Sequence, residues 1–295
     1  MKIFVTGASG FIGSAVVADL LAAGHHVVGL ARSDASARSI TGAGAEVQRG
    51  GLDDLDVLRQ AADSADGVIH LAFRHDFDDF GSSAQLDRRA IETLGDALVG
   101  SGRPLVVAGG IVGLAPGKTL TEDQPAPPEA PRFSEAAVLG FTGRGVRTSV
   151  VRLPPSVHGE GDKGFVPTLI RVAREKGAAA YVGDGANRWP AVHRLDAARA
   201  FRLALETAPA GSVIQAVDDE GVPARDIAQI IGTHLQVRVT SVPVEDAYSH
   251  FGWIGPLFAL DAPASSKRTR QLLGWQPTHE KLLDDLDAGH YFTQP

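Results

Sequence analysis

The residues with the clearest chemical purpose form a glycine-rich segment near the amino end, TGASGFIG at positions 6–13. It follows a strand-like run and precedes a helix-like run, the context in which such glycine spacing has meaning. The first glycine permits a tight turn, the second lets the backbone approach a diphosphate, and the third lets the helix pack against the strand. Free N–H groups at the start of the helix attract phosphate. The segment predicts a dinucleotide site with contacts from Gly7, Gly10, Phe11, Ile12 and Gly13.

The end of the second strand-like run indicates which dinucleotide fits. An acidic side chain there hydrogen-bonds the adenosine ribose of NAD, whereas a basic one accommodates the 2′-phosphate of NADP. The run reads VVGLARSD, so Ala31 stands where the acid is expected, and Arg32 and Ser33 follow. Because a guanidinium forms forked hydrogen bonds to phosphate, we expect NADP(H) in preference to NAD(H), with contacts from Arg32 and Ser33. The alternatives are that Arg32 is only a solvated charge, or that Asp34 contacts the ribose.

Strand-like and helix-like patterns alternate through the first half of the chain. Runs rich in Val and Ile occur at 2–7, 26–31, 45–50, 67–72, 104–109 and 146–153, and helix-like segments lie near 11–23, 54–63, 82–100 and 132–142. Such alternation is typical of βαβ units and a parallel sheet. After about residue 220 the pattern becomes mostly helical. We predict the α/β class, a doubly wound parallel sheet (Rossmann) with a smaller, mostly helical C-terminal substrate cap.

The predicted parts form one compact unit. Residues 1–153, completed by about 191–217, are expected to bind the dinucleotide, and residues 154–190 and 218–295 to bind the substrate. Residues 113–131 hold five prolines and little periodicity. A loop of that length inside a compact unit is usually functional or mobile.

Composition excludes several function classes. The 295 residues carry 28 Lys+Arg against 35 Asp+Glu, a formal charge of −7, which disfavours nucleic acid as a partner. The absence of cysteine excludes a disulfide scaffold, a thiolate metal site and a Cys nucleophile. No apolar run is long enough to span a membrane, and the first residues lack a signal-peptide layout. We therefore expect a cytoplasmic protein that acts on a small-molecule substrate, without a membrane partner.

The chain resembles the short-chain dehydrogenase/reductase superfamily, in particular its extended NAD(P)-dependent epimerase/dehydratase branch. The glycine spacing is GxxGxxG, and further similar segments are VIHLA (68–72), VVRLPPSVHGEGD (150–162), VGDGANRWPAVHRLDAARA (182–200) and SSKRTRQLLGWQP (265–277). The resemblance implies that Leu71, Ala72 and Phe73 pass the ribose and nicotinamide, and that Pro154, Pro155 and Ser156 border the nicotinamide. It also implies a possible homodimer through residues 82–100 and 132–142.

The catalytic residues that the resemblance implies are absent. The family uses a Tyr and a Lys four residues apart, with a Ser or Thr that orients the substrate oxygen. None of the three tyrosines has a Lys four residues later: Tyr181, Tyr248 and Tyr291. Alignment on Ser134 puts Pro131 at the Tyr position and Glu135 at the Lys position, and Gly109 and Gly110 stand where the Ser or Thr is expected. The sequence therefore predicts an atypical member of the superfamily.

Other side chains are candidates for the vacant roles. The candidates for proton transfer follow the fourth and sixth strand-like runs: His75, Asp76, Ser156 and His158. A His beside carboxylates can act as acid or base near neutral pH, although the loop after the fourth run can also be a hydrated acidic segment, and Ser156 and His158 can have structural roles. No companion His spacing supports a metal there, so no metal is expected. The candidates for substrate binding are Arg132, Glu135, Arg188, Trp189 and His193, with Arg270 as a further cation from the cap.

Three functions remain open. The first is an NADP(H)-dependent oxidoreductase of the atypical short-chain dehydrogenase/reductase type, acting on a small carbonyl or alcohol substrate. The second is a redox-silent NADP-binding sensor or regulatory protein, which the vacant catalytic positions favour. The third is an epimerase/dehydratase-like lyase or isomerase. No GxSxG elbow, P-loop or HExxH motif supports another enzyme class.

Overall fold

A parallel sheet organises the larger part of the chain. The computed structural model describes residues 1–74, 79–127, 130 and 132–293, and these residues form a sheet of seven strands in the order β10-β6-β5-β4-β1-β2-β3. Every neighbouring pair is parallel. The strands are β1 (Lys2–Thr6), β2 (His26–Ala31), β3 (Glu46–Arg49), β4 (Gly67–His70), β5 (Pro104–Gly110), β6 (Arg147–Leu153) and β10 (Ser212–Gln215). The predicted doubly wound sheet is confirmed.

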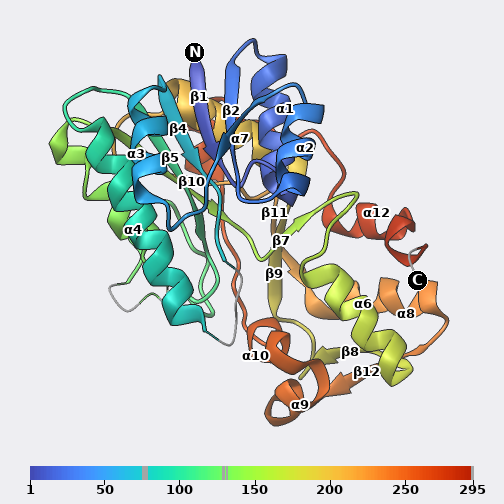
Figure 1. Ribbon diagram of the computed structural model, residues 1–295. Coiled ribbons are helices and arrows are strands. Elements are labelled where there is room, and N and C mark those ends of the chain that lie inside the picture. Colours follow the sequence, from blue (N-terminus) through green and yellow to red (C-terminus); the bar gives the residue numbers. More distant parts are fainter. Residues whose placement is uncertain (75–78, 128–129, 131, 294–295) are drawn as a thin grey trace.

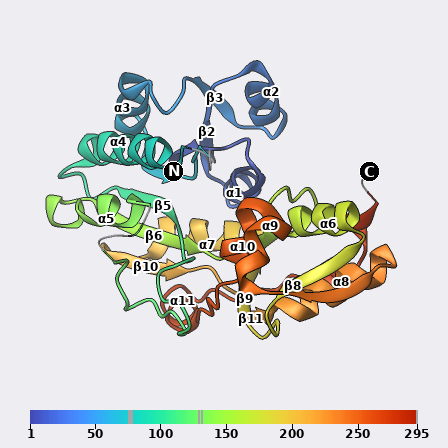
Figure 2. The ribbon, with the colours of Figure 1, turned by 90° about the horizontal axis from the view of Figure 1, so that it is seen from below.

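Helices cover both faces of this sheet (Figures 1 and 2). One face carries α1 (Phe11–Ala22), α2 (Asp34–Gly42) and α7 (Arg194–Thr207), and the other carries α3 (Leu55–Asp63), α4 (Phe80–Leu98) and α5 (Ser134–Leu139). Successive strand residues point to opposite faces, so Val5 enters the core under α1 and α7, whereas Phe4 enters the core under α3 and α4. Helix α2 was not predicted, because Ile40 is its only buried residue and the segment shows little hydrophobic pattern.

The smaller part lies beyond the carboxyl ends of these strands (Figure 1). Its described strands form two small sheets, one of β7 (Ser156–His158), β9 (Arg188–His193) and β11 (Asp219–Pro223), the other of β8 (Ala178–Val182) and β12 (Arg238–Val242). The helices of the smaller part are α6 (Phe165–Lys176), α8 (Ala224–Leu235), α9 (Ala247–Phe251), α10 (Gly255–Phe258) and α12 (Leu282–Asp287), with short 3-10 turns between several of them. Helix α11 (Lys267–Leu273) packs against α7 and β10 of the larger part. The sequence analysis anticipated helices but not these strands. The predicted assignment of residue ranges to two parts stays a prediction.

None of the helices in the described ranges combines the length and the apolar character that crossing a bilayer requires.

The glycine-rich turn allows α1 to pack closely against the end of β1. Gly7 has a φ of +70°, a backbone conformation that side chains other than glycine rarely adopt. Gly13 is packed so closely that a Cβ on it would lie 1.9 Å from the carbonyl oxygen of Gly7. The first turn of α1 can therefore approach the end of β1 only because position 13 has no side chain.

The carboxyl end of the chain is tied to β7 by polar side chains. His158, which is fully buried, contacts Asp285 through Nδ1 at 2.8 Å, and the other oxygen of Asp285 lies 2.9 Å from Nε2 of His290. The hydroxyl of Tyr291 accepts from the N–H of Gly159 at 3.0 Å and donates to Asp162 at 3.2 Å. Burial raises the pKa of Asp162 to about 6, although hydrogen bonds from Gly164 and Tyr291 oppose the shift.

Replacement of Gly13 by Ala tests the close packing of α1. Because the new Cβ would meet backbone rather than a flexible side chain, we expect Gly13→Ala to lower the free energy of unfolding by about 1–3 kcal/mol. Urea unfolding of the two proteins measures the difference. Gly81, near the start of α4, has open space around it, so Gly81→Ala should be neutral or stabilising by up to about 1 kcal/mol. Equal effects of both substitutions would contradict the steric argument.

The raised pKa of Asp162 predicts a pH-dependent stability. Its folded pKa of about 6 exceeds the usual 3.8, so the folded state binds the proton more tightly and loses stability as pH rises from 3.8 to 6. Asp162→Asn removes the free-energy cost of ionising a buried carboxyl group. We therefore expect this substitution to stabilise the protein at pH 8 by about 1–2 kcal/mol, and we expect the gain to shrink as the pH falls from 6 to 4. Urea unfolding across this pH range measures it. Asp63→Asn, at an exposed carboxylate, should show no such dependence.

Candidate functional site

The start of α1 fits an anion. Gly10 precedes the helix in an extended conformation, no side chain caps the first turn, and that turn contains no acidic residue. A Cβ on Gly7 would meet the backbone nitrogen of Ala72 at 2.8 Å, so glycine is also required where the turn passes the end of β4. The uncapped N–H groups and the positive end of the helix suit the diphosphate of a dinucleotide. The predicted contacts along Gly7, Gly10 and Gly13 stay a prediction.

The segment after β4 is fixed against β1. The backbone N–H groups of Leu71 and Ala72 both donate to the Thr6 hydroxyl oxygen at 3.2 Å. Phe73 follows, with its ring 5.6 Å from that of Phe80. The predicted cofactor contacts Leu71, Ala72 and Phe73 are thus partly exposed residues directly beside the glycine-rich turn. His75 and Asp76, the predicted acid–base pair, lie outside the described residues.

The end of β2 carries an available cation. Arg32 is exposed, and among the described residues it makes no hydrogen bond or ion pair. Ser33 caps α2 by accepting from the N–H of Ser36 at 3.1 Å. Asp34, the alternative ribose partner, forms an ion pair with Arg49 at the end of β3. The carboxylate that would favour NAD is therefore already paired, whereas the guanidinium that would favour NADP is not.

A buried chain of hydrogen bonds starts at the same edge of the sheet. The hydroxyl oxygen of Thr6 accepts from two N–H groups, so its own hydrogen is directed to Nδ1 of His70, 2.8 Å away. His70 then donates from Nε2 to Asp87 at 3.1 Å. The other oxygen of Asp87 accepts from the Ser134 hydroxyl, which in turn accepts from Nε of Arg132 at 2.7 Å. Thr6, His70, Asp87 and Ser134 are at most 1% exposed.

The series of buried hydrogen bonds ends at the guanidinium of Arg132, whose Nη2 makes no hydrogen bond in the described structure. The Arg132 guanidinium lies over the Phe73 ring, 4.2 Å from its centroid, and its Nη2 is 3.6 Å from Asp87. Nη2 is buried and has no hydrogen-bond partner in the described structure. Burial opposes ionisation of Asp87, but the hydrogen bond from His70 and the charge of Arg132 outweigh it, so the pKa of Asp87 lies below its usual value. Asp87 is therefore a carboxylate that holds Arg132 in place.

Glu135, predicted to border the substrate, is bound to another arginine. Arg152 on β6 is fully buried, and its Nε and Nη2 donate to the two oxygens of Glu135, each at 2.7 Å. Nη2 also donates to the carbonyl of Gln124 in the proline-rich loop. Arg152, on a strand of the sheet, thus neutralises the negative charge of Glu135, the residue aligned with the family's Lys. The described part of this loop is held by a buried ion pair, which costs several kcal/mol to break on one side.

Other predicted residues have partners within the smaller part. Trp189, only 1% exposed, donates from Nε1 to the buried Ser156 hydroxyl at 2.8 Å. His158 and His193 lie opposite each other on β7 and β9, with ring centroids 5.5 Å apart. Pro154 is buried and Pro155 partly so. These side chains hold strands together here, and burial leaves little of Ser156, His158 and Trp189 to contact a substrate.

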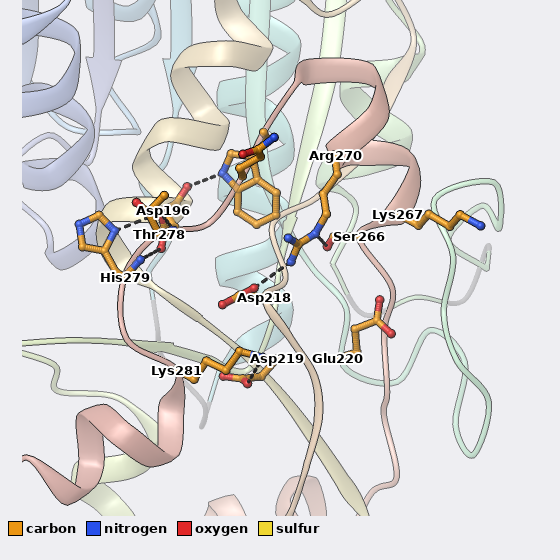
Figure 3. Close-up of polar contacts among 12 residues, drawn as sticks. Asp196, Asp218, Asp219, Glu220, Ser266, Lys267, Arg270, Thr278, His279 and Lys281 are labelled. Atoms are coloured by element: carbon orange, nitrogen blue, oxygen red, sulfur yellow. Dashed lines mark hydrogen bonds and ion pairs between the residues drawn. The ribbon is translucent and has the colours of Figure 1, made fainter.

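The predicted cations of the cap are also paired. Arg188 binds both oxygens of Asp261, at 3.0 and 2.8 Å. Arg270 donates to Asp218 at 2.8 Å and to Ser266 at 3.0 Å, as Figure 3 shows. An anionic substrate would have to displace a carboxylate at either position. Arg132 differs from both because its Nη2 is buried and has no hydrogen-bond partner in the described structure.

One cluster brings potential metal ligands together but does not form a metal site. Nitrogens of His193 and His279 and an oxygen of Asp196 lie within 4.8 Å of one another. The two imidazoles are stacked, with centroids 4.7 Å apart and planes at 12°, so their in-plane lone pairs run parallel instead of converging on one ion. Both oxygens of Asp196 already accept backbone N–H groups, from Thr278 and His279 (Figure 3). Burial, together with the neighbouring His158 and His279, lowers the pKa of His193.

Sequence reasoning missed Thr6, His70 and Asp87. His70 lies inside the VIHLA segment, but its partners are 64 and 17 residues away, so local pattern gave no signal. An Asp on an amphipathic helix normally faces solvent. Only the three-dimensional arrangement shows that Asp87 faces inward and that Ser134 and Arg132 reach it.

Comparisons with known proteins agree with this architecture. A model of the NAD dependent epimerase/dehydratase family matches residues 3–89 and 134–216. An uncharacterized protein of Schizosaccharomyces pombe is 49% identical over 99% of this chain and 100% of its own length. A 4-hydroxy-2-methyl-3-oxo-4-farnesyl-3,4-dihydroquinoline-1-oxide ketoreductase of Stigmatella aurantiaca is 25% identical, covering 97% of this chain and 96% of its own.

The fold is also that of solved family structures. The dTDP-glucose 4,6-dehydratase DesIV of Streptomyces venezuelae, solved with NAD bound, superimposes with a TM-score of 0.78 at 20% identity, over 98% of this chain and 96% of its own. The matched segments span more than half of the chain and include the glycine-rich turn, β4 and β6. The protein therefore belongs to the NAD-dependent epimerase/dehydratase family.

Proposed function

We propose that the protein is an NADP(H)-dependent oxidoreductase that interconverts a small carbonyl compound and the corresponding alcohol. The family and a full-length relative named as a ketoreductase support a reductase more than a sensor. The observation that carries the proposal is the Arg132 guanidinium, which the buried Asp87 carboxylate holds over the Phe73 ring and whose Nη2 has no hydrogen-bond partner in the described structure. The predicted homodimer through α4 and α5 stays part of this proposal.

The bound dinucleotide would supply the hydride, and the protein's own residues would bind and orient. The start of α1 would bind the diphosphate, and Arg32 with Ser33 would bind the 2′-phosphate. Nη2 of Arg132 is buried, so it would donate to the substrate carbonyl oxygen only once neighbouring side chains move aside, and it would then stabilise the negative charge that develops there. Asp87 and Ser134 would keep the guanidinium in position. Because the aligned Tyr and Lys positions hold Pro131 and Glu135, the proton would come from water.

Cofactor preference can be tested at Arg32. Removal of its charge takes away a charge-assisted contact to the 2′-phosphate, so Arg32→Gln should weaken NADPH binding about 10-fold or more. NADH binding should change by less than about 2-fold, because NADH has no such phosphate. Fluorescence titration with each coenzyme measures both constants.

The matched control is Arg59→Gln, at an exposed arginine on α3. It should leave both titrations unchanged. Tighter binding of NADH than NADPH by the unaltered protein would overturn the assigned preference, whatever the variants do.

Catalysis can be tested at Arg132. Loss of a donor aimed at a developing negative charge typically costs about 100-fold to 1000-fold in turnover. We expect Arg132→Gln to lower kcat for NADPH-dependent reduction of an active carbonyl compound by that order, with coenzyme affinity within about 2-fold of the original. A panel of aldehydes, ketones and enones identifies the substrate first.

Arg132→Lys keeps the charge opposite Asp87, so it separates loss of chemistry from loss of the fold and should retain part of the activity. Arg89→Gln, at an exposed arginine on α4, is the surface control. An unaltered protein that binds NADPH but reduces no compound of the panel would favour a redox-silent role. Full activity in a folded Arg132→Gln would exclude Arg132 from the chemistry.

A further inference from the structure

Arg194 is a second cation beside the glycine-rich turn, and it was not among the predicted cofactor contacts. It is the first residue of α7, directly after β9, and its side chain is partly buried. Its guanidinium carbon lies 5.3 Å from the centroid of the Phe11 ring. Within the described ranges, Arg194 makes no hydrogen bond and no ion pair. Stacking on a ring engages the face of a guanidinium and leaves its in-plane N–H groups free to bind an anion.

The packing of α1 against α7 places the positive charge of Arg194 beside the start of α1. The two helices pack together, and both begin at the carboxyl edge of the sheet, because each leads back to a strand that runs parallel to its neighbours (Figure 1). Arg202 lies eight residues after Arg194, and Asp19 lies eight residues after Phe11. Arg202 and Asp19 form an ion pair at 2.7 Å. An arginine of α7 therefore faces a residue of α1 at two levels, eight residues apart. At the first level Arg194 faces the Phe11 ring, and at the second level Arg202 faces the acid Asp19.

At the first level, where Arg194 faces Phe11, the first turn of α1 has no acidic residue to pair with Arg194. That turn has no side-chain cap either. Asp196, the acid in the first turn of α7, accepts instead from the N–H groups of Thr278 and His279 (Figure 3). An unpaired guanidinium and an uncapped helix start thus adjoin each other, and a small dianion between them would satisfy both.

We propose that Arg194 binds the diphosphate of the dinucleotide from its place over the Phe11 ring at the start of α1. The inference rests on the proposed function, since it needs a dinucleotide at the start of α1. It assigns different parts of the ligand to two arginines: Arg32 contacts the 2′-phosphate, which only NADP(H) has, whereas Arg194 contacts the diphosphate, which NAD(H) and NADP(H) share. Arg194 then adds affinity without adding discrimination between the coenzymes.

Coenzyme titrations of Arg194→Gln test this assignment. We expect the Kd for NADPH and the Kd for NADH to rise by about the same factor, about 10-fold or more, with Arg194→Lys in between. Adenosine 2′-phosphate, which has no diphosphate, should bind Arg194→Gln within about 2-fold of the unaltered protein and should bind Arg32→Gln more weakly. Arg199→Gln, on the same helix, is the matched control, because within the described residues Arg199 has one hydrogen bond, a long one of 3.5 Å to the carbonyl of Gln276.

The outcomes separate the two proposals. Equal coenzyme binding by Arg194→Gln and the unaltered protein would overturn the role of Arg194 and leave the proposed function standing. An equal loss for adenosine 2′-phosphate would also overturn it, since the damage would then be general. If the unaltered protein binds neither NADPH nor NADH, the proposed function fails, and the role of Arg194 fails with it.

Discussion

The contact on which the site depends is the one between the first turn of α1 and the end of β1. It has no room for a Cβ on Gly13, and the resulting proximity directs the uncapped N–H groups of α1 toward the edge where β1 and β4 end. The Thr6 hydroxyl fixes the backbone of Leu71 and Ala72 at the same point. A displaced helix start would therefore disturb both the anion site and the hydrogen-bond chain that begins at Thr6.

The second determinant of the site is a reversal of charge. Where the resembled family has a Lys, this chain has Glu135, and Arg152 neutralises it from within the sheet. The positive charge instead sits at Arg132, three residues earlier, paired with Asp87 on α4. A buried charge is tolerated only when it is paired, so each substitution needed a partner on another element. In the described structure Glu135 is paired with Arg152 and Arg132 with Asp87.

The sequence was informative where the pattern is local. The glycine spacing and the alternation of apolar runs predicted the turn and six of the strands, because both depend on neighbours within a few residues. The pairing of Arg188 with Asp261, 73 residues away, could not be anticipated, and neither could the inward orientation of Asp87. Ser156 and His158, predicted as proton-transfer candidates, instead contact Trp189 and Asp285. Polar residue types indicate chemistry only when their partners are known.

The closing segment of the chain limits how the molecule can open. Trp275 and the backbone of Thr278 are held by Asp196 on α7, which covers the main sheet, whereas Asp285 holds His158 in the smaller part. One stretch of polypeptide therefore fastens both halves, and a wide hinge movement between them would require its release.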